Sequence, residues 1–294
     1  MKIKKYENQE TEQVRELINL NFEDEYLLDI LTSSALNFAY SAIAENKLVG
    51  IAVAWTSSFH PHCTYFRILS NPLYNTLNVE EKLLSKVLEF KALDHPLQTS
   101  FWGSSFNLLE LYKDNGFNEI RRTYMPTLKV SSVAHDTPNG EKRYNVKTLN
   151  EVLLNETMTE QLILLVKRIY EETHQVNPVA EMTLEQWRGI IFSDDLITTG
   201  SYIYLDENEE NILAYSFLHE SDEEDKIELG WCGASTTEHI DLIPELVHHQ
   251  IKYTLKQEFQ FLTGEFDTTD SYAMRILASF PFTPSPTWVT VQKS

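Results

Sequence analysis

The sequence predicts a mixed α/β protein, an α+β arrangement with a mixed sheet, built as two similar lobes in tandem. The first observation is a repeated helix end. Residues 111–117 (LYKDNGF) run from an apolar helix through a stop into an aromatic strand start, and residues 276–282 (ILASFPF) repeat that order 165 residues later. A turn and strand at residues 46–50 recur at residues 210–214, an offset of 164 residues. The nearly constant offset indicates a duplication.

Length and composition agree with two globular lobes. A chain of 294 residues has room for about two domains, each with its own core. The hydrophobic content is 42%, and no apolar run approaches the roughly 20 residues that a membrane helix needs. The basic start is followed by a polar stretch, so no signal peptide is evident. Cys63 and Cys232 fall in different halves, as free thiols of a reducing compartment would. We therefore expect a cytoplasmic protein with no membrane association.

The charge is strongly acidic and unevenly distributed. The net charge of −20 argues against a nucleic-acid partner, because phosphate binding draws on clustered Lys and Arg. Residues 1–134 carry 13 Lys and Arg against 16 Asp and Glu, which leaves 11 against 28 for residues 135–294, so the two parts carry −3 and −17. A solvated acidic surface explains this excess more simply than a cation-attracting site, although the second interpretation stays open.

The patterns in the first half predict, in order along the chain, one strand, two helices, three strands, a helix, a strand, a helix and a final strand. Acidic residues 23–25 lie at the expected start of the second helix, where the helix dipole favours them. Residues 45–47 join two β-rich runs and predict a hairpin. Periodicity and strand composition predict strands over residues 1–6, 38–44, 48–55, 63–69, 99–102 and 117–130, and helices around residues 14–18, 26–31, 79–88 and 108–115.

The second half repeats this order after a connector with strong turn signals. Two capping-box patterns, at residues 157–160 and 183–186, predict helix starts, and an apolar stripe from Met158 to Ile169 predicts a core-facing helix. An acidic turn at residues 206–210 predicts a second hairpin. The remaining expected elements are strands over residues 144–146, 202–205, 212–218 and 227–234, a helix over 243–255, an acidic strand end at 264–270, and a last helix before Pro281.

The segment from Tyr112 to Phe117, between a helix and a strand, resembles the closing signature of the GNAT N-acyltransferase superfamily. The order of strands and helices in both halves extends the resemblance over nearly the whole chain. It implies a first GNAT-like lobe over residues 1–130, a linker over residues 131–141 and a second lobe over residues 142–294. It also implies acetyl-CoA, or a related acyl-CoA, as the cofactor.

In this family the coenzyme loop follows the fourth strand, and its glycines let the backbone approach the phosphates at a helix start. Pro72, Tyr74, Leu83 and Leu84 match the family pattern, whereas Thr76, Asn78 and Glu80 stand at its glycine positions. The second loop, residues 235–241, also lacks glycine. The resemblance places the coenzyme in lobe 1 against Leu69, Ser70, Asn75, Thr76, Leu77, Asn78 and Val79, and in lobe 2 against Cys232, Gly233 and Ala234.

The resemblance also places a catalytic acid at Tyr112, because a phenol can donate a proton and regain it from solvent. Tyr112 as a packed core aromatic is an equally good interpretation. The matching position in lobe 2 is Leu277, which cannot donate a proton. Glu228 lies on a strand where carboxylates serve as bases in this family, although strand alternation favours a solvent-facing side chain. Lobe 1 is the favoured site of activity.

Two functions of different classes follow. The first is an N-acyltransferase that moves an acetyl or acyl group from acyl-CoA to a small amine. The second is a binding or assembly module of GNAT origin that has lost the coenzyme, which the loss of both glycine loops favours. Residues 60–63 combine two histidines with a thiol, but they lack the second ligand pair of a structural zinc site, so no metal is expected.

Overall fold

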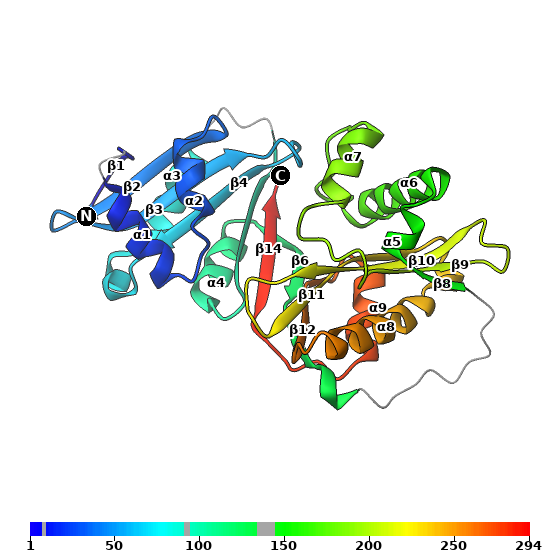
Figure 1. Cartoon of the computed structure of the whole chain (residues 1–294). Helices are drawn as coiled ribbons and strands as arrows, with labels where there is room; N and C mark the ends of the chain where they lie inside the picture. The colour runs from blue at the N-terminus through cyan, green and yellow to red at the C-terminus, as the bar shows by residue number, and fades with distance from the viewer. Residues whose placement is uncertain (8–9, 91–94, 134–144) are drawn as a thin grey trace. The chain divides into compact units, whose positions relative to one another are not determined.

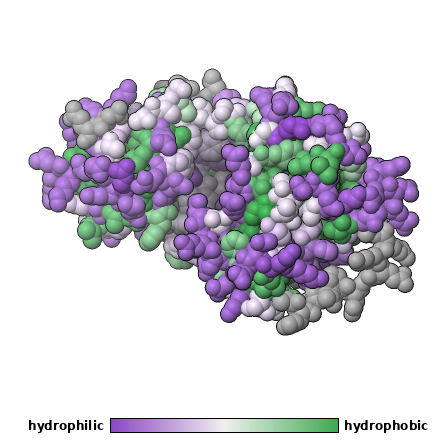
Figure 2. All heavy atoms as spheres, in the orientation of Figure 1, coloured by the Kyte–Doolittle hydropathy of each residue, from purple (hydrophilic) through white to green (hydrophobic). Residues whose placement is uncertain are grey.

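The computed structural model describes residues 1–7, 10–90, 95–133 and 145–294 (Figure 1). The chain divides into two compact units. Unit 1 contains residues 1–120, 176–180 and 289–294, and unit 2 contains residues 121–175 and 181–288. In the part that the structure describes, no helix is long and apolar enough to cross a membrane. Figure 2 shows hydrophilic side chains over much of the visible surface.

Unit 1 is a mixed sheet covered by helices. Its strands follow the order β1-β2-β3-β4-β5-β14. Glu45 and Asn46 both adopt a positive φ, 52° and 61°, which gives the tight hairpin expected between β2 and β3. The elements are β1 (Lys2–Lys5), α1 (Thr11–Leu20), α2 (Tyr26–Thr32), β2 (Leu36–Ala44), β3 (Lys47–Thr56), β4 (Thr64–Ser70), α3 (Val79–Leu88), β5 (Leu97–Trp102), α4 (Phe106–Asp114) and part of β14 (Thr287–Lys293).

Alternation along these strands builds a separate apolar core on each face of the sheet. One cluster joins α1 and α2 to residues such as Ile51 and Val53 of β3. The other joins α3 and α4 to residues such as Phe66 of β4, and it includes Val289 and Val291 of β14. The C-terminal strand is therefore part of the core of unit 1.

Unit 2 has the strand order β7-β12-β11-β10-β9-β8. A short additional pair joins β6 to β13 through Tyr124–Phe266 and Thr123–Asp267. The elements are β6 (Asn118–Tyr124), β7 (Thr127–Lys129), β8 (Asn145–Thr148), α5 (Leu149–Val152), α6 (Glu156–Thr173), α7 (Leu184–Ile191), β9 (Tyr202–Leu205), β10 (Ile212–Glu220), β11 (Lys226–Ala234), α8 (Leu242–Lys256), β12 (Phe261–Gly264), β13 (Phe266–Asp267) and α9 (Ser271–Ser279).

The two sheets repeat one topology. Strands β8-β9-β10-β11-β12 of unit 2 correspond in order to β1-β2-β3-β4-β5 of unit 1. In each set the fourth and fifth strands, β4 with β5 and β11 with β12, form a parallel pair, and the earlier neighbours are antiparallel. The sixth place is filled by β14, from the end of the chain, in unit 1 and by β7, from its middle, in unit 2. The predicted fold class is confirmed.

Some sequence expectations differ from the structure near the middle of the chain. A single strand over residues 117–130 is wrong: the segment breaks between β6 and β7, where Pro126 lacks the N–H that a continuous ladder needs. The helix expected to start at Thr157 starts at Glu156, with Asn155 as its N-cap. The capping box expected at Thr183 is present, and a further capping box joins Thr148 to Glu151.

The expected division at residues 131–141 also differs from the compact units. Residues 289–294 belong to unit 1, because they supply core residues there, and residues 121–133 belong to unit 2. Most of the expected linker lies outside the described residues. Its described beginning is a short 3₁₀ turn, Val130–Ser132, and the side chain of Val133 is buried.

Candidate functional site

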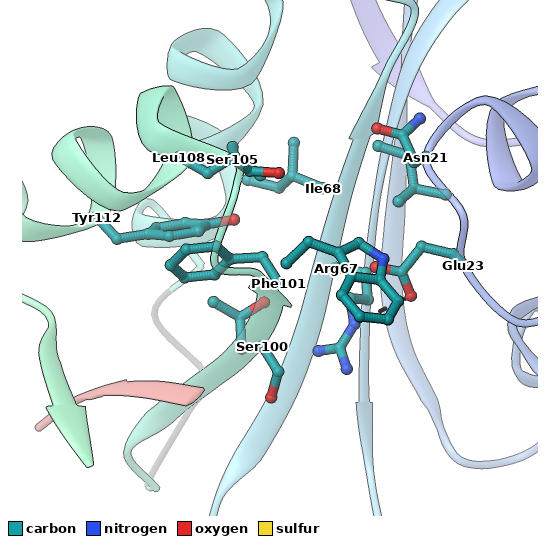
Figure 3. A pocket seen from close by; sticks show the side chains of 12 residues that line it. Asn21, Glu23, Arg67, Ile68, Ser100, Phe101, Ser105, Leu108 and Tyr112 are labelled. Atoms are coloured by element: carbon teal, nitrogen blue, oxygen red, sulfur yellow. Dashed lines mark ion pairs between the residues drawn. The ribbon is translucent and has the colours of Figure 1, made fainter. Parts of the chain in front are cut away.

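The first candidate site lies where β4 and β5 separate. The two strands pair only at Thr64–Leu97 and Tyr65–Gln98. Beyond these pairs a cavity opens onto about 320 Å³ of space, its mouth included. It is lined from β4, β5, α4 and the segment between α1 and α2, by Asn21, Glu23, Arg67, Ile68, Leu69, Thr99, Ser100, Phe101, Trp102, Ser105, Leu108 and Tyr112 (Figure 3).

Tyr112 enters this cavity from α4, and its hydroxyl points toward β4 in Figure 3. Its ring is packed edge-on or tilted against Phe66, Phe101 and Phe117, with ring centroids 5.3–5.8 Å apart, and the residue is 1% exposed. Burial raises the pKa of Tyr112 well above its ordinary value, and the nearby Arg67 charge partly offsets the rise. The two interpretations of Tyr112 are therefore compatible, since its ring belongs to the core while its hydroxyl faces the cavity.

An ion pair that the sequence did not indicate lies across the cavity from Tyr112. Arg67 of β4 approaches Glu23, from the segment between α1 and α2, with Nε and Oε2 3.4 Å apart. The side chains of Arg67 and Glu23 are only 10% and 7% exposed. Burial raises the pKa of the Glu23 carboxyl, and Arg67 works in the opposite direction. In Figure 3 the Arg67 and Glu23 side chains lie next to each other.

Local structure explains why Glu23 turns inward. Phe22 adopts a positive φ of 54°, which ends α1 sharply. Asn21 fixes the turn by donating to the carbonyl oxygens of Leu17 and Ser70, at 2.7 and 3.0 Å. The neighbouring acids have ordinary surface roles, since Asp24 accepts from the Tyr26 N–H and Glu25 binds Arg15. The sequence of the acidic residues 23–25 does not indicate which of the three side chains is buried.

The expected coenzyme loop of lobe 1 is a 3₁₀ turn, η2 (Pro72–Leu77), followed by α3. Asn75, Thr76 and Asn78 are exposed, Leu77 is half-buried and Val79 is buried. Asn78 takes a positive φ of 50°, so an asparagine fills one position where the family pattern has glycine. Asn tolerates this left-handed conformation better than most residues.

The start of α3 presents both attraction and repulsion to an anion. The N–H groups of residues 79–81 have no side-chain cap, and no described carbonyl accepts from them. The Lys82 ammonium lies beside the same loop, 2.8 Å from the Leu77 carbonyl oxygen. The Glu80 carboxylate, however, accepts from Ser70 Oγ at 2.5 Å and adds negative charge at this helix start. The backbone donors fit a phosphate-bearing group, and Glu80 weakens that fit.

Lobe 2 contains a second cavity beside β11, the strand that corresponds to β4. Strands β11 and β12 pair from Lys226–Phe261 to Leu229–Gly264. The cavity lies beyond these pairs on β11 and opens onto about 250 Å³, its mouth included. It is lined from α6, β10, β11 and the N-cap of α9, by Val166, Ile169, Tyr170, Thr173, His174, Tyr215, Trp231, Cys232 and Asp270.

The structure does not bring the predicted base of lobe 2, Glu228, together with the predicted coenzyme residues. Cys232 lines the cavity, but burial raises the pKa of its thiol well above the ordinary value. Ala234 is fully buried at the end of β11. Glu228 is exposed, accepts from Ser221 Oγ at 3.1 Å and does not line the cavity. This is the solvent-facing position that strand alternation favoured, because Ile227 and Leu229 point inward.

Gly233 is explained by packing within the lobe. A Cβ atom there would lie 2.3 Å from Ile169 Cδ1 and 2.9 Å from Tyr215 Cε1, so these neighbouring side chains would have to move to make room for it. The groups that pack closely against the Gly233 backbone are therefore side chains of α6 and β10. In the following loop, Arg168 donates to the Ser235 carbonyl oxygen at 2.8 Å, and the His239 ring lies 2.9 Å from Ser235 Oγ.

The histidine and cysteine run of lobe 1 has structural contacts of its own. His60 Nδ1 lies 2.9 Å from the Asn177 carbonyl oxygen. Asn177 in turn donates to the Tyr65 hydroxyl at 2.6 Å. Burial raises the pKa of the Cys63 thiol to about 11. Within the described ranges, no group of three or more His, Cys, Asp or Glu side chains could hold a metal ion.

Comparison with known proteins identifies the fold. No protein-family model and no curated protein sequence matches the chain. A GCN5-related N-acetyltransferase from Sphaerobacter thermophilus has a similar structure, with a TM-score of 0.62, 12% identity, and 99% of this chain and 95% of that chain covered. A tandem GNAT protein from the clavulanic acid biosynthesis pathway has a TM-score of 0.61 and 12% identity, with 99% and 98% covered.

A third structure, an acetyltransferase of the GNAT family from Colwellia psychrerythraea, has a TM-score of 0.57 and 11% identity, with 100% of both chains covered. At these identities the likeness is one of fold. It extends over 98% or more of both chains in these last two comparisons, one of them with a tandem protein, in agreement with the repeated strand order found here. The chain therefore has the tandem GNAT fold.

Proposed function

We propose that lobe 1 catalyses transfer of an acetyl or other acyl group from an acyl-CoA to the amino group of a small molecule. The observation that carries the proposal is the shared cavity between β4 and β5, in which the Tyr112 hydroxyl and the Glu23 carboxylate face the same space. These two groups are a proton donor and a proton acceptor, and amide formation from an amine needs both.

Different residues of lobe 1 would bind the coenzyme and form the wall of the cavity. The N–H groups of residues 79–81 and the Lys82 ammonium would hold the phosphates of the coenzyme, and the thioester supplies an acyl group already activated for transfer. Leu69, at the end of β4, contributes an apolar wall. The acceptor amine enters the cavity from its open side.

Glu23 acts as the proton acceptor for the amine. Its pKa is raised by burial, which brings the carboxylate nearer to the range in which a general base is effective, and Arg67 keeps it ionised and oriented. Tyr112 Oη keeps its proton over the ordinary pH range, because burial raises its pKa, and it can protonate a leaving group. The acidic surface of the second half would raise the local concentration of a cationic amine.

We also propose a reducing, cytoplasmic location and no nucleic-acid or membrane partner. Cys63 and Cys232 are both buried and free, which is the usual state of cysteines in that compartment. The large negative charge disfavours a nucleic-acid partner.

The direct test combines acetyl-CoA binding with turnover. Thermal unfolding is measured with increasing acetyl-CoA, and a ligand at 100 times its Kd should stabilise the chain by about 2.7 kcal/mol. Release of free thiol is then followed with a panel of small primary amines. An absence of both effects would contradict the proposal and favour a binding or assembly module that has lost the coenzyme.

A matched pair of variants locates the coenzyme. Glu80→Gln removes the negative charge at the start of α3 but keeps an acceptor for Ser70, so we expect tighter acetyl-CoA binding. Glu238→Gln makes the same change in the loop of lobe 2 and should leave binding unchanged. Tighter binding in Glu238→Gln alone would place the coenzyme in lobe 2.

A further inference from the structure

We propose that the cavity of lobe 2 is a binding site for a small organic cation, of the alkylammonium class, and that this site carries no acyl-transfer chemistry. The cavity is lined by residues of α6, β10, β11 and the residue before α9. The residues that line it combine a carboxylate, aromatic rings and apolar side chains. Of the described residues in this lining, Asp270 is the only Asp, Glu, Lys or Arg, and His174 is the only histidine.

Asp270 supplies the negative charge. Its Oδ1 atom caps α9 by accepting from the N–H groups of Tyr272 and Ala273, at 2.8 and 3.1 Å. Among the described side chains, no Lys, Arg or His forms an ion pair with Asp270. A carboxylate drawn partly out of water is costly unless a cation or several donors compensate it. A bound cation would complete the compensation that the helix cap begins.

Aromatic rings line the same cavity as this carboxylate. The rings of Tyr170 and Trp231 lie 5.0 Å apart between centroids, and the His174 ring stacks on Tyr170 at 3.9 Å. Tyr215 is 1% exposed and forms part of the same lining. Electron-rich ring faces attract organic cations, most strongly where water is excluded. Val166 and Ile169 would contact the alkyl part of such a ligand.

Acyl transfer of the kind proposed for lobe 1 is not expected here, because the position that corresponds to the phenol of lobe 1 carries no proton donor. Leu277 occupies the place on α9 that corresponds to Tyr112 on α4. The buried Cys232 is held in its protonated, unreactive form. The excess acid of residues 135–294 would draw a cation toward this lobe without binding it specifically. The aromatic cavity then provides the selectivity for an organic ion.

The test is isothermal titration of the full chain with ethylammonium chloride, with NaCl holding the ionic strength constant, and with ethanol as a neutral probe of similar size. We expect saturable ethylammonium binding and none for ethanol. Asp270→Asn removes the charge and keeps an equally good N-cap, so the fold should persist while affinity falls at least tenfold. Glu228→Gln removes an exposed carboxylate of β11 and should bind as the natural chain does.

Trp231→Leu is a second test variant, since it removes one aromatic ring from the cavity and leaves the Asp270 carboxylate in place. We expect its affinity for ethylammonium to fall as well. Unchanged binding in Asp270→Asn, equal responses to ethylammonium and ethanol, or no saturable binding would each overturn the proposal. The readout is independent of acyl transfer, so an inactive lobe 1 would not affect it.

Discussion

The cavities of the two lobes both lie along the fourth strand of the repeated topology and reach the N-cap of the helix that follows the fifth strand, but corresponding positions carry different side chains. Arg67 of β4 and Trp231 of β11 both lie three residues before the end of their strand. Ser105 and Asp270 are the N-caps of α4 and α9. Lobe 1 thus has an ion pair and a phenol, whereas lobe 2 has an aromatic wall and one carboxylate. A duplicated scaffold can keep its backbone while a few substitutions change its chemistry.

The largest effect is expected for the phenol of lobe 1. Tyr112→Phe keeps the ring packing against Phe66 and Phe101 but removes the hydroxyl, so turnover should fall by roughly 10² to 10⁴ with little change in stability. Steady-state kinetics and thermal unfolding measure both quantities. Glu228→Gln is the matched change in lobe 2. If Tyr112→Phe is silent while Glu228→Gln abolishes turnover in folded protein, the active lobe is the second one.

The next effect concerns the buried carboxylate of lobe 1. Glu23→Gln keeps a hydrogen-bond acceptor for Arg67 but cannot accept a proton, so kcat/KM should fall by about 10² or more. In the natural chain kcat/KM should decline as pH drops through the Glu23 pKa, which lies above its ordinary value, because the base becomes protonated. That acidic limb should disappear in the variant.

Asp24→Asn is the control for this substitution, because Asp24 is adjacent and exposed, and Asn can still accept from the Tyr26 N–H. The acidic limb should persist in this variant and move slightly toward lower pH, because the Asp24 charge is a minor cause of the raised Glu23 pKa. An acidic limb that persists in Glu23→Gln would show that another group is the proton acceptor.

A third prediction separates packing from ligand binding in lobe 2. Gly233→Ala places a methyl group against Ile169 and Tyr215 and should lower the free energy of unfolding by about 1–3 kcal/mol, measured with urea. Gly189→Ala is the control, since nothing lies within 4 Å of its added Cβ on α7. This control should stabilise the helix by about 0.4–1 kcal/mol. An undiminished stability in Gly233→Ala would contradict the packing role.

The smallest effect is a pH-dependent gain in stability at Asp270. Burial raises the pKa of its carboxyl in the folded chain, so ionisation there opposes folding at neutral pH, and this cost disappears as pH falls through the raised pKa. Asp270→Asn should therefore be slightly more stable than the natural chain near pH 7, and the difference should shrink at acidic pH. Thermal unfolding at several pH values measures it. A constant or reversed difference would contradict the burial argument.

Much of the fold could be predicted from local sequence. The offset of about 165 residues between the halves predicted two lobes, and alternation predicted the strands and the outward side of Glu228. Periodicity predicted the helices, and α4 and α9 end shortly before Gly116 and Pro281. The strand from residue 287 was missed, because its partners are about 190 residues earlier, as in the Ser100–Thr290 hydroxyl contact of 2.9 Å.

The sequence by itself determined the repeat, the order of most helices and strands along the chain and the place of Tyr112 at a helix end, because local pattern and chain connectivity suffice for these. Only the tertiary structure decided that Glu23 meets Arg67, that the last strand completes the core of unit 1, and that Gly233 accommodates Ile169. Each of these contacts joins residues more than 40 positions apart. Such contacts depend on register and packing, and a side chain's neighbours are fixed only when the strands and helices around it have assembled.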